Sequence, residues 1–160
     1  MKVAIYCRVS TEEQTLFNQV DICTEWAEKN GHEVFKTYTE KESGAKTSRP
    51  IFNQMLEDMR KYKFRMVVVT KLDRIGRSLQ HLLSLFDEFH NKKVEFVAVT
   101  QNIDTSTAGG KLQMQIMGAF AEFERAIISE RTKEGLRKAE NVGKRGKDKK
   151  PRQKRGGLRK

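Results

Sequence analysis

Cysteine is scarce in this sequence of 160 residues, which contains only Cys7 and Cys23. Their spacing is not C-x-x-C and no histidine pair lies nearby, so we expect two small core residues rather than a disulfide framework or a structural zinc site. Long apolar runs are also absent. The longest, residues 116–121, is far shorter than a bilayer crossing, and Arg8 comes too early for a signal peptide. We therefore expect a cytoplasmic protein with no membrane partner.

Histidine is almost as rare, with His32, His81 and His90 as the three examples. His81 and His90 fall on a predicted helix, far in the sequence from Ser10, the serine that is considered below as a nucleophile. A Ser-His-Asp triad is therefore not expected. Carboxylates and histidines show no metal-ligand spacing, there is no Walker lysine loop, and Gly109-Gly110 is not a dinucleotide fingerprint. The sequence thus predicts no metal, no nucleotide and no other cofactor.

Positive charge, in contrast, is abundant and unevenly distributed. The net charge is +11, but residues 1–140 carry 22 basic and 20 acidic side chains, whereas residues 141–160 carry 10 basic side chains against Asp148 alone. Such a tail favours a polyanion partner, and nucleic acid is preferred over an acidic membrane because no apolar anchor accompanies the charge. Residues 143–160 have no apolar period and are expected to be a basic, disordered tail.

Hydropathy alternates between strand and helix periods along residues 1–108. The predicted elements are a strand at 3–9, a helix at 11–30, a strand at 33–39, a loop at 40–49, a helix from Pro50, a strand at 66–70, a helix starting near Gly76 or Ser78, and a strand at 94–100. This order is typical of an α/β fold with a mostly parallel sheet flanked by helices. Ligands bind beyond the carboxyl ends of such strands, where topology would bring Ser10 and residues 73–77 together.

From residue 109 the pattern becomes one long helix, assigned to residues 109–142. It carries two apolar stripes, one formed by Leu112, Ile116, Phe120, Phe123 and Ile127, and the other by Met114, Met117, Ala121 and Ile128. One stripe can cover the sheet domain of residues 1–108. The other either widens the core-facing surface or forms a dimer interface, and periodicity alone leaves both open.

Tyr6, Arg8 and Ser10 share one face of the first strand, which ends where a ligand would lie. Ser10 is either an ordinary helix cap or a nucleophile. Arg8 needs an anionic partner within a buried sheet, either a structural carboxylate or a substrate phosphate.

A second cluster, Lys71, Asp73, Arg74 and Arg77, follows a central strand. The cluster is either a solvated loop with local ion pairs or a phosphate-binding site. In the second case Arg74 and Arg77 would share a helix face if a helix begins there. Arg49 would add another cation by closure of its loop. In the second interpretation a serine hydroxyl attacks phosphorus while arginines neutralise the phosphoryl oxygens. Asp73 then transfers a proton or orients the arginines.

Four motifs together resemble the catalytic domain of the serine site-specific recombinases, the resolvase and invertase group, over nearly all of residues 1–140. They are Tyr6-Cys7-Arg8-Val9-Ser10-Thr11 with Gln14 and Gln19; Glu42-Ser43-Gly44 leading to Arg49-Pro50; Lys71-Leu72-Asp73-Arg74-Ile75-Gly76-Arg77-Ser78; and Glu122-Phe123-Glu124-Arg125 with Ser129-Glu130-Arg131-Thr132.

The resemblance implies that Ser10 attacks a phosphodiester of double-stranded DNA, forming a phosphoserine bond to the 5′ end and releasing a 3′ hydroxyl. It assigns the contacts to the phosphate and the transition state to four arginines: Arg8, Arg49, Arg74 and Arg77. It assigns supporting positions in the active site to five further residues: Asp73, Gln19, Tyr6, Gln14 and Lys71. The long helix resembles the family's dimerisation helix, with Glu124, Arg125, Glu130 and Arg131 at interface and DNA-facing positions. A homodimer would pair into a tetramer that cuts four strands and exchanges them by rotation, in a nucleoid-associated, cytoplasmic protein.

Small members of that family carry a helix-turn-helix after the long helix, and residues 147–160 have too few apolar side chains to build one. Lys144 and Arg145 would supply phosphate contacts, which position a protein on DNA without specifying a sequence. Two other functions stay open: a non-catalytic nucleic-acid-binding module on the same fold, and a phosphoester hydrolase that uses the same cationic pocket.

Overall fold

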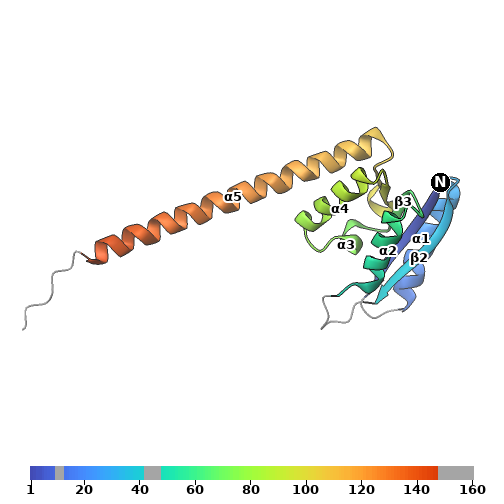
Figure 1. Ribbon diagram of the computed structural model, residues 1–160, viewed down its shortest axis with the longest axis horizontal. Helices are drawn as coiled ribbons and strands as arrows, with labels where there is room; N and C mark the ends of the chain where they lie inside the picture. Colours follow the sequence, from blue (N-terminus) through green and yellow to red (C-terminus); the bar gives the residue numbers. More distant parts are fainter. Residues whose placement is uncertain (10–12, 42–47, 148–160) are drawn as a thin grey trace, which may run out of the picture. The chain divides into compact units, whose positions relative to one another are not determined.

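In the part of the chain that the structure describes, five strands form one sheet in the order β2-β1-β3-β4-β5. Figure 1 labels β2 and β3 of this sheet together with the helices. This computed structural model describes residues 1–9, 13–41 and 48–147, with side chains for 1–9, 16–41 and 48–139. The strands are β1 (Lys2–Val9), β2 (Glu33–Lys41), β3 (Met66–Val69), β4 (Glu95–Ala98) and β5 (Ile103–Asp104). The first four are parallel, and β5 is antiparallel to β4. The predicted mostly parallel α/β sheet is confirmed, with an antiparallel edge that the sequence pattern did not predict.

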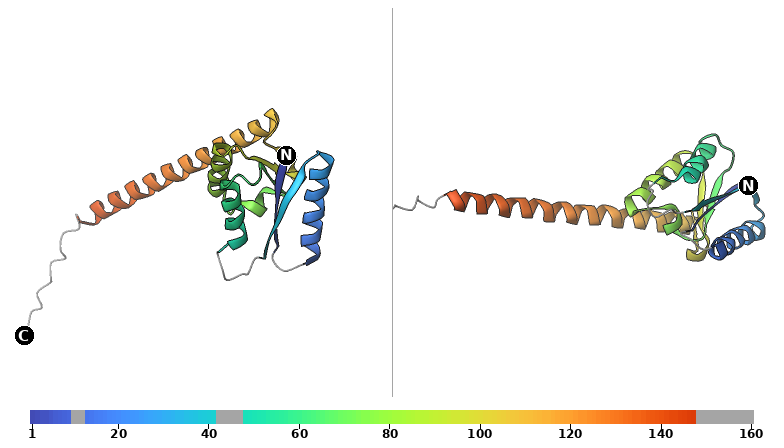
Figure 2. Two further views of the ribbon diagram at one scale, coloured as in Figure 1. Left: turned by 45° about the vertical axis from the view of Figure 1, so that its right-hand side comes forward. Right: turned by 90° about the horizontal axis from the view of Figure 1, so that it is seen from below.

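Helices cover both faces of this sheet (Figure 2). They are α1 (Glu13–Lys29), α2 (Pro50–Arg60), α3 (Leu72–Ile75), α4 (Leu79–Asn91) and α5 (Ala108–Lys147), with a 3₁₀ turn at Val99–Gln101. The alternation in β1 divides the core: Ile5 and Cys7 pack with α1, whereas Ala4 and Tyr6 pack with α2 and α4. Among the described residues, no helix is long and apolar enough to cross a bilayer.

The chain order creates a switch point between β1 and β3. From β1 the chain moves to β2 on one side and then returns to β3 on the other, with α1 on one face and α2 on the opposite face. At such a reversal the two connections diverge and leave a crevice at the carboxyl ends of the strands. Residues that follow β1 and β3 therefore meet at one place.

The first part of α5 has one apolar face in the core and another on the surface. Met114 and Met117 pack against the sheet domain and Ala121 is buried, whereas Leu112 and Phe120 are more than half exposed. Up to Ala121 the two predicted stripes thus have different surroundings, but Ile128, predicted on the stripe of Met114, is exposed. The chain divides into two compact units, Met1–Ala121 and a second that begins at Glu122, and α5 extends to Lys147, past the predicted end at residue 142.

A close backbone approach fixes the start of α5. Thr107 donates its hydroxyl to the carbonyl of Asp104 at 2.8 Å and accepts the N–H of Gly110 at 3.0 Å. A Cβ at Gly110 would lie 1.8 Å from the Asp104 carbonyl oxygen, which is backbone and cannot rotate away. Glycine is therefore required at this position for space.

A buried carboxylate links β2 to α2. Asp58 accepts the hydroxyl of Tyr38 at 2.7 Å and pairs with Lys63 at 2.7 Å. Hydrogen bonds from Lys63 and Tyr38 hold the pKa of Asp58 below its ordinary value of 3.8, against the opposing effect of burial.

Gly110→Ala should lower the free energy of unfolding by about 2 kcal/mol or more, because the added methyl overlaps a main-chain carbonyl. Gly109 is the matched control, since a Cβ there meets nothing within 4 Å. Gly109→Ala should leave stability unchanged or raise it by up to about 1 kcal/mol through helix propensity. Urea unfolding followed by circular dichroism measures both, and equal effects would contradict the steric explanation.

The contribution of Asp58 should depend on pH. Because its pKa is lower in the folded than in the unfolded chain, its stabilisation is present above pH 3.8 and disappears as pH falls through the folded-state value. Asp58→Asn should therefore lose less stability than the parent on acidification across this window. Asp87→Asn, at an exposed position on α4, should follow the parent. Parallel unfolding curves for all three proteins would show that Asp58 does not act in this way.

Candidate active site

The candidate site lies at the switch point, where β1 continues beyond its pairing with β3. The last pair of the β1–β3 ladder is Ile5 with Val68, whereas pairing with β2 continues to Val9. The short helix α3, which follows β3, contacts β1 here. The main chain of Arg8 is therefore available to side chains on the β3 side.

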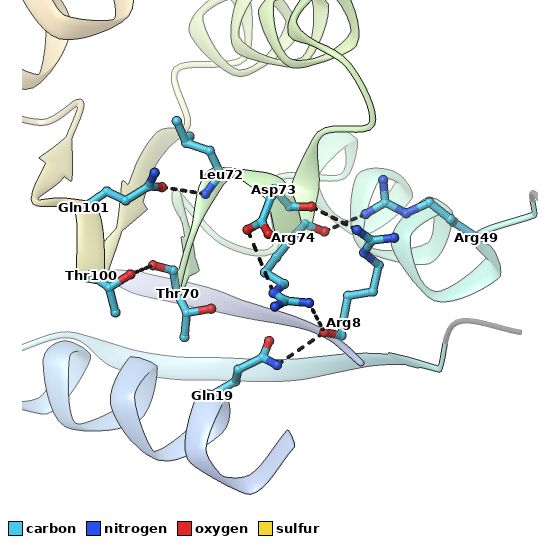
Figure 3. A network of polar contacts seen from close by, with 9 residues as sticks. All are labelled: Arg8, Gln19, Arg49, Thr70, Leu72, Asp73, Arg74, Thr100 and Gln101. Atoms are coloured by element: carbon cyan, nitrogen blue, oxygen red, sulfur yellow. Dashed lines mark hydrogen bonds and ion pairs between the residues drawn. The ribbon is translucent and has the colours of Figure 1, made fainter. Parts of the chain in front are cut away.

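Arg8 connects β1, α1 and α3 through both its ends (Figure 3). Its Nη2 donates to the carbonyl of Asp73 at 3.0 Å. Its own carbonyl accepts Nη1 of Arg74 at 3.3 Å and Nε2 of Gln19, also at 3.3 Å. Four residues predicted from separate parts of the sequence are thus in direct contact.

Arg49 is the most enclosed cation of the group, with 7% of its surface exposed. It donates to the carbonyl of Ile75 at 2.7 Å, to the carbonyl of Arg74 at 3.0 Å and to the hydroxyl of Tyr6 at 2.9 Å. Its guanidinium carbon lies 4.0 Å from the centre of the Phe52 ring, a cation–π contact. The predicted closure of Arg49 onto the cluster therefore occurs in the folded chain.

The carbonyl groups that hold Arg8 and Arg49 come from α3. In a four-residue helix most carbonyls have no partner within the helix, and their partial negative charge attracts cations. The acceptors in these contacts are carbonyl and phenol oxygens, which orient the guanidinium groups. The result is a concentration of positive charge at the end of the sheet, suited to an anion.

The remaining polar groups modulate this charge. Burial raises the pKa of the Tyr6 hydroxyl, and the hydrogen bond and charge of Arg49 oppose that rise. The carboxylate of Asp73 lies 3.9 Å from Nε of Arg74 and its side chain is 66% exposed. The main-chain carbonyl of Asp73 thus contacts Arg8, and its carboxylate lies at the exposed edge of the cluster, near Arg74.

Two residues that sequence reasoning missed support the site. Gln101 follows β4 and accepts the N–H of Leu72 at 2.7 Å, which caps α3 (Figure 3). Glu40, near the end of β2, is buried and accepts the N–H of Phe52 at 2.9 Å, which caps α2. Both lie at the carboxyl end of a strand or just beyond it, so a search of every such position would have found them. In the described chain, no three His, Cys, Asp or Glu side chains gather as metal ligands would.

The linker between α3 and α4 corrects one expectation. Arg74 is in α3, whereas Arg77 lies after it in the extended segment from Gly76 to Ser78, so the two do not share a helix face. Arg77 and Lys71 have exposed side chains. Ser78, one of the two predicted starts of this helix, is the N-cap of α4 and accepts the N–H of His81 at 3.1 Å.

His81 is far from Ser10 in the sequence, yet in the structure it lies beside Arg49 and Arg77. Its Nδ1 accepts the main-chain N–H of Arg77 at 3.3 Å. Burial lowers the pKa of His81, and the charges of Arg49 and Arg77 lower it further. No sequence signal distinguished this histidine from a surface residue.

Several predicted residues have other placements. Ser10 lies outside the described residues, as do the side chains of Gln14, Lys144 and Arg145. Four predicted interface and DNA-facing residues are exposed on α5: Glu124, Arg125, Glu130 and Arg131. The structure therefore brings together Tyr6, Arg8, Gln19, Arg49, Asp73 and Arg74.

Known proteins are similar to this chain in sequence and in fold. Residues 3–145 match the family described as Resolvase, N terminal domain. The Transposon Tn917 resolvase of Enterococcus faecalis is 40% identical over 141 residues, covering 88% of this chain and 72% of its own length. The serine recombinase gin of Escherichia phage Mu is 39% identical over 143 residues, covering 88% of this chain and 69% of its own length.

The crystal structure of the N-terminal catalytic domain of TP901-1 integrase superposes with a TM-score of 0.73 at 41% identity, covering 79% of this chain and 98% of that one. Sequence match, fold and the arginine cluster at the switch point agree. The chain belongs to the resolvase family and is a recombinase catalytic domain of the resolvase and invertase type.

Proposed function

We propose that this chain cleaves and rejoins double-stranded DNA through a covalent bond between Ser10 and the 5′ phosphate. The observation that carries the proposal is the arginine cluster. Arg8, Arg49 and Arg74 meet at the carboxyl ends of β1 and β3 and make their described hydrogen bonds to uncharged oxygens. Ser10 comes directly after Val9, the last residue of β1, in the sequence.

The reaction requires no change in the number of phosphate ester bonds. The Oγ–P bond to Ser10 forms as the P–O3′ bond breaks, and the proton lost by the serine balances the one gained by the 3′ oxygen. Guanidinium groups stabilise the negative charge that develops on the phosphoryl oxygens. Reversal by a different 3′ hydroxyl joins the strand to a new partner without an external energy source.

Asp73 has the geometry of an orienting residue. Its carboxylate lies at 3.9 Å from Arg74 Nε, and its main-chain carbonyl accepts from Arg8. Both of these contacts involve arginines, which supports an orienting role for Asp73. Gln19 supports the same arrangement through the carbonyl of Arg8.

The exposed stripe on the first part of α5 fits a second copy of the chain. Leu112, Ile116 and Phe120 are 55%, 48% and 63% exposed, which is unfavourable for apolar side chains in water. We infer a homodimer through this stripe, and a tetramer of two dimers during strand exchange. The basic residues from Lys144 onward would contact DNA phosphates and place the protein at the nucleoid in the cytoplasm.

Ser10→Ala should abolish a covalent protein–DNA adduct while leaving DNA affinity nearly unchanged, because the hydroxyl is the nucleophile and the arginines bind the phosphate. The assay uses labelled duplexes with a randomised centre, denaturation in detergent and gel separation. Mass spectrometry then locates the modified residue. Ser84→Ala is the control, since Ser84 is exposed on α4 and bonds only locally to the Gln80 carbonyl.

Equal adduct yield from the parent and Ser10→Ala would reject Ser10 as the nucleophile. Tight DNA binding by the parent with no adduct would favour the non-catalytic binding module instead. Release of free phosphate or hydrolysed ends, with no trapped protein, would favour a phosphoester hydrolase.

Ile116→Glu should shift the protein from dimer to monomer in sedimentation velocity, since a charge would then be buried in an apolar interface. Gln115→Glu adds the same charge at an exposed polar position about 100° around the helix axis from Ile116, outside the stripe, and should leave the distribution unchanged. A parent that sediments as a monomer at every concentration, or two variants that dissociate equally, would refute the proposed interface.

A further inference from the structure

His81 ties the first turn of α4 to the linker that carries Arg77. Its main-chain N–H donates to Ser78 Oγ at 3.1 Å, and its Nδ1 accepts from the main-chain N–H of Arg77 at 3.3 Å. The imidazole thus accepts a hydrogen bond from a residue that precedes the helix by two positions. An imidazole can accept at Nδ1 only when that nitrogen carries no proton, so this contact requires the tautomer protonated at Nε2.

The same ring is close to the most enclosed arginine. The centres of the His81 and Phe52 rings are 6.2 Å apart, and Phe52 stacks on the guanidinium of Arg49. The linker is also tightly packed, because a Cβ at Gly76 would come within 3.0 Å of the Leu82 side chain. His81 is therefore next to both the Arg77 main chain and the pair formed by Phe52 and Arg49.

We propose that His81 is a positioning residue whose neutral imidazole holds the main chain of Arg77, and so sets where the Arg77 guanidinium meets the DNA phosphate. Protonation of the ring in mild acid removes the acceptor and slows cleavage. This inference rests on the proposed function, since it assumes that Arg77 contacts the scissile phosphate.

The surroundings of the ring support a switch of this kind. The groups that face it are Arg49 ahead of α2, Phe52 on α2 and Arg77 on the linker, and Glu40 caps Phe52 from β2. Burial and the two arginine charges keep the pKa of His81 below 6.5, so the ring is neutral at pH 7. Neither arginine titrates in this range. A proton on His81 would add a third cation and break the bond to Arg77.

The test compares adduct formation by the parent, His81→Asn and His81→Ala between about pH 5 and 8. Asn places an amide oxygen near the position of Nδ1 and does not titrate, so it should keep the rate at neutral pH and lose the acid decline. His81→Ala removes the acceptor and should slow adduct formation about tenfold at neutral pH, with DNA affinity unchanged. His90→Asn, at an exposed position at the other end of α4, should keep the parent's profile.

A second measurement needs no DNA cleavage. In a proton–nitrogen NMR titration, the Arg77 amide signal should shift with the same midpoint as the His81 ring, and this shift should vanish in His81→Asn. An Arg77 amide that does not follow the ring, or an acid decline retained in His81→Asn, would overturn the positioning role. Absence of adduct from the parent at every pH would instead overturn the proposed function, and the amide titration would then decide the role of His81 alone.

Discussion

The cost of burying guanidinium groups governs the architecture around the switch point. A charged group removed from water must find strong partners, and Arg49 is almost fully enclosed. Its partners are the last carbonyls of α3, the hydroxyl of Tyr6 and the ring of Phe52. α3 in turn begins with a cap from Gln101 beyond β4. Elements from both halves of the sheet must therefore be in place before the cluster can form.

Much of this arrangement could be predicted from sequence, because it depends on topology. Strand-to-helix alternation predicts a parallel sheet, and a parallel sheet brings the ends of β1 and β3 together whatever the side chains are. The sequence predicts this meeting for Ser10 and residues 73–77; Ser10 lies outside the described residues, and Arg8, two residues before it, accepts a hydrogen bond from Arg74. The cap of α4 at Ser78 followed from local rules that depend on few residues.

Other features could not be predicted because they depend on three-dimensional contacts. α3 has too few residues for a helical period, so its end at Ile75, which separates Arg74 from Arg77, could not be predicted. β5 has two residues and becomes a strand only through its pairing with β4. His81 looked like a surface residue because its significance lies in a bond to the main chain of Arg77, which has no signature in side-chain spacing.

The length of α3 has a consequence for how this catalytic domain can vary. A helix satisfies its own carbonyls once it exceeds a few turns, and only its last four remain available to outside donors. If an insertion extended α3 by a turn, the carbonyls of Asp73, Arg74 and Ile75 would accept from the helix itself. Arg8 and Arg49 would then lose their acceptors although no arginine had changed. Insertions at this point are therefore expected to be tolerated far less than insertions in surface loops, since the brevity of the helix is itself part of the anion site.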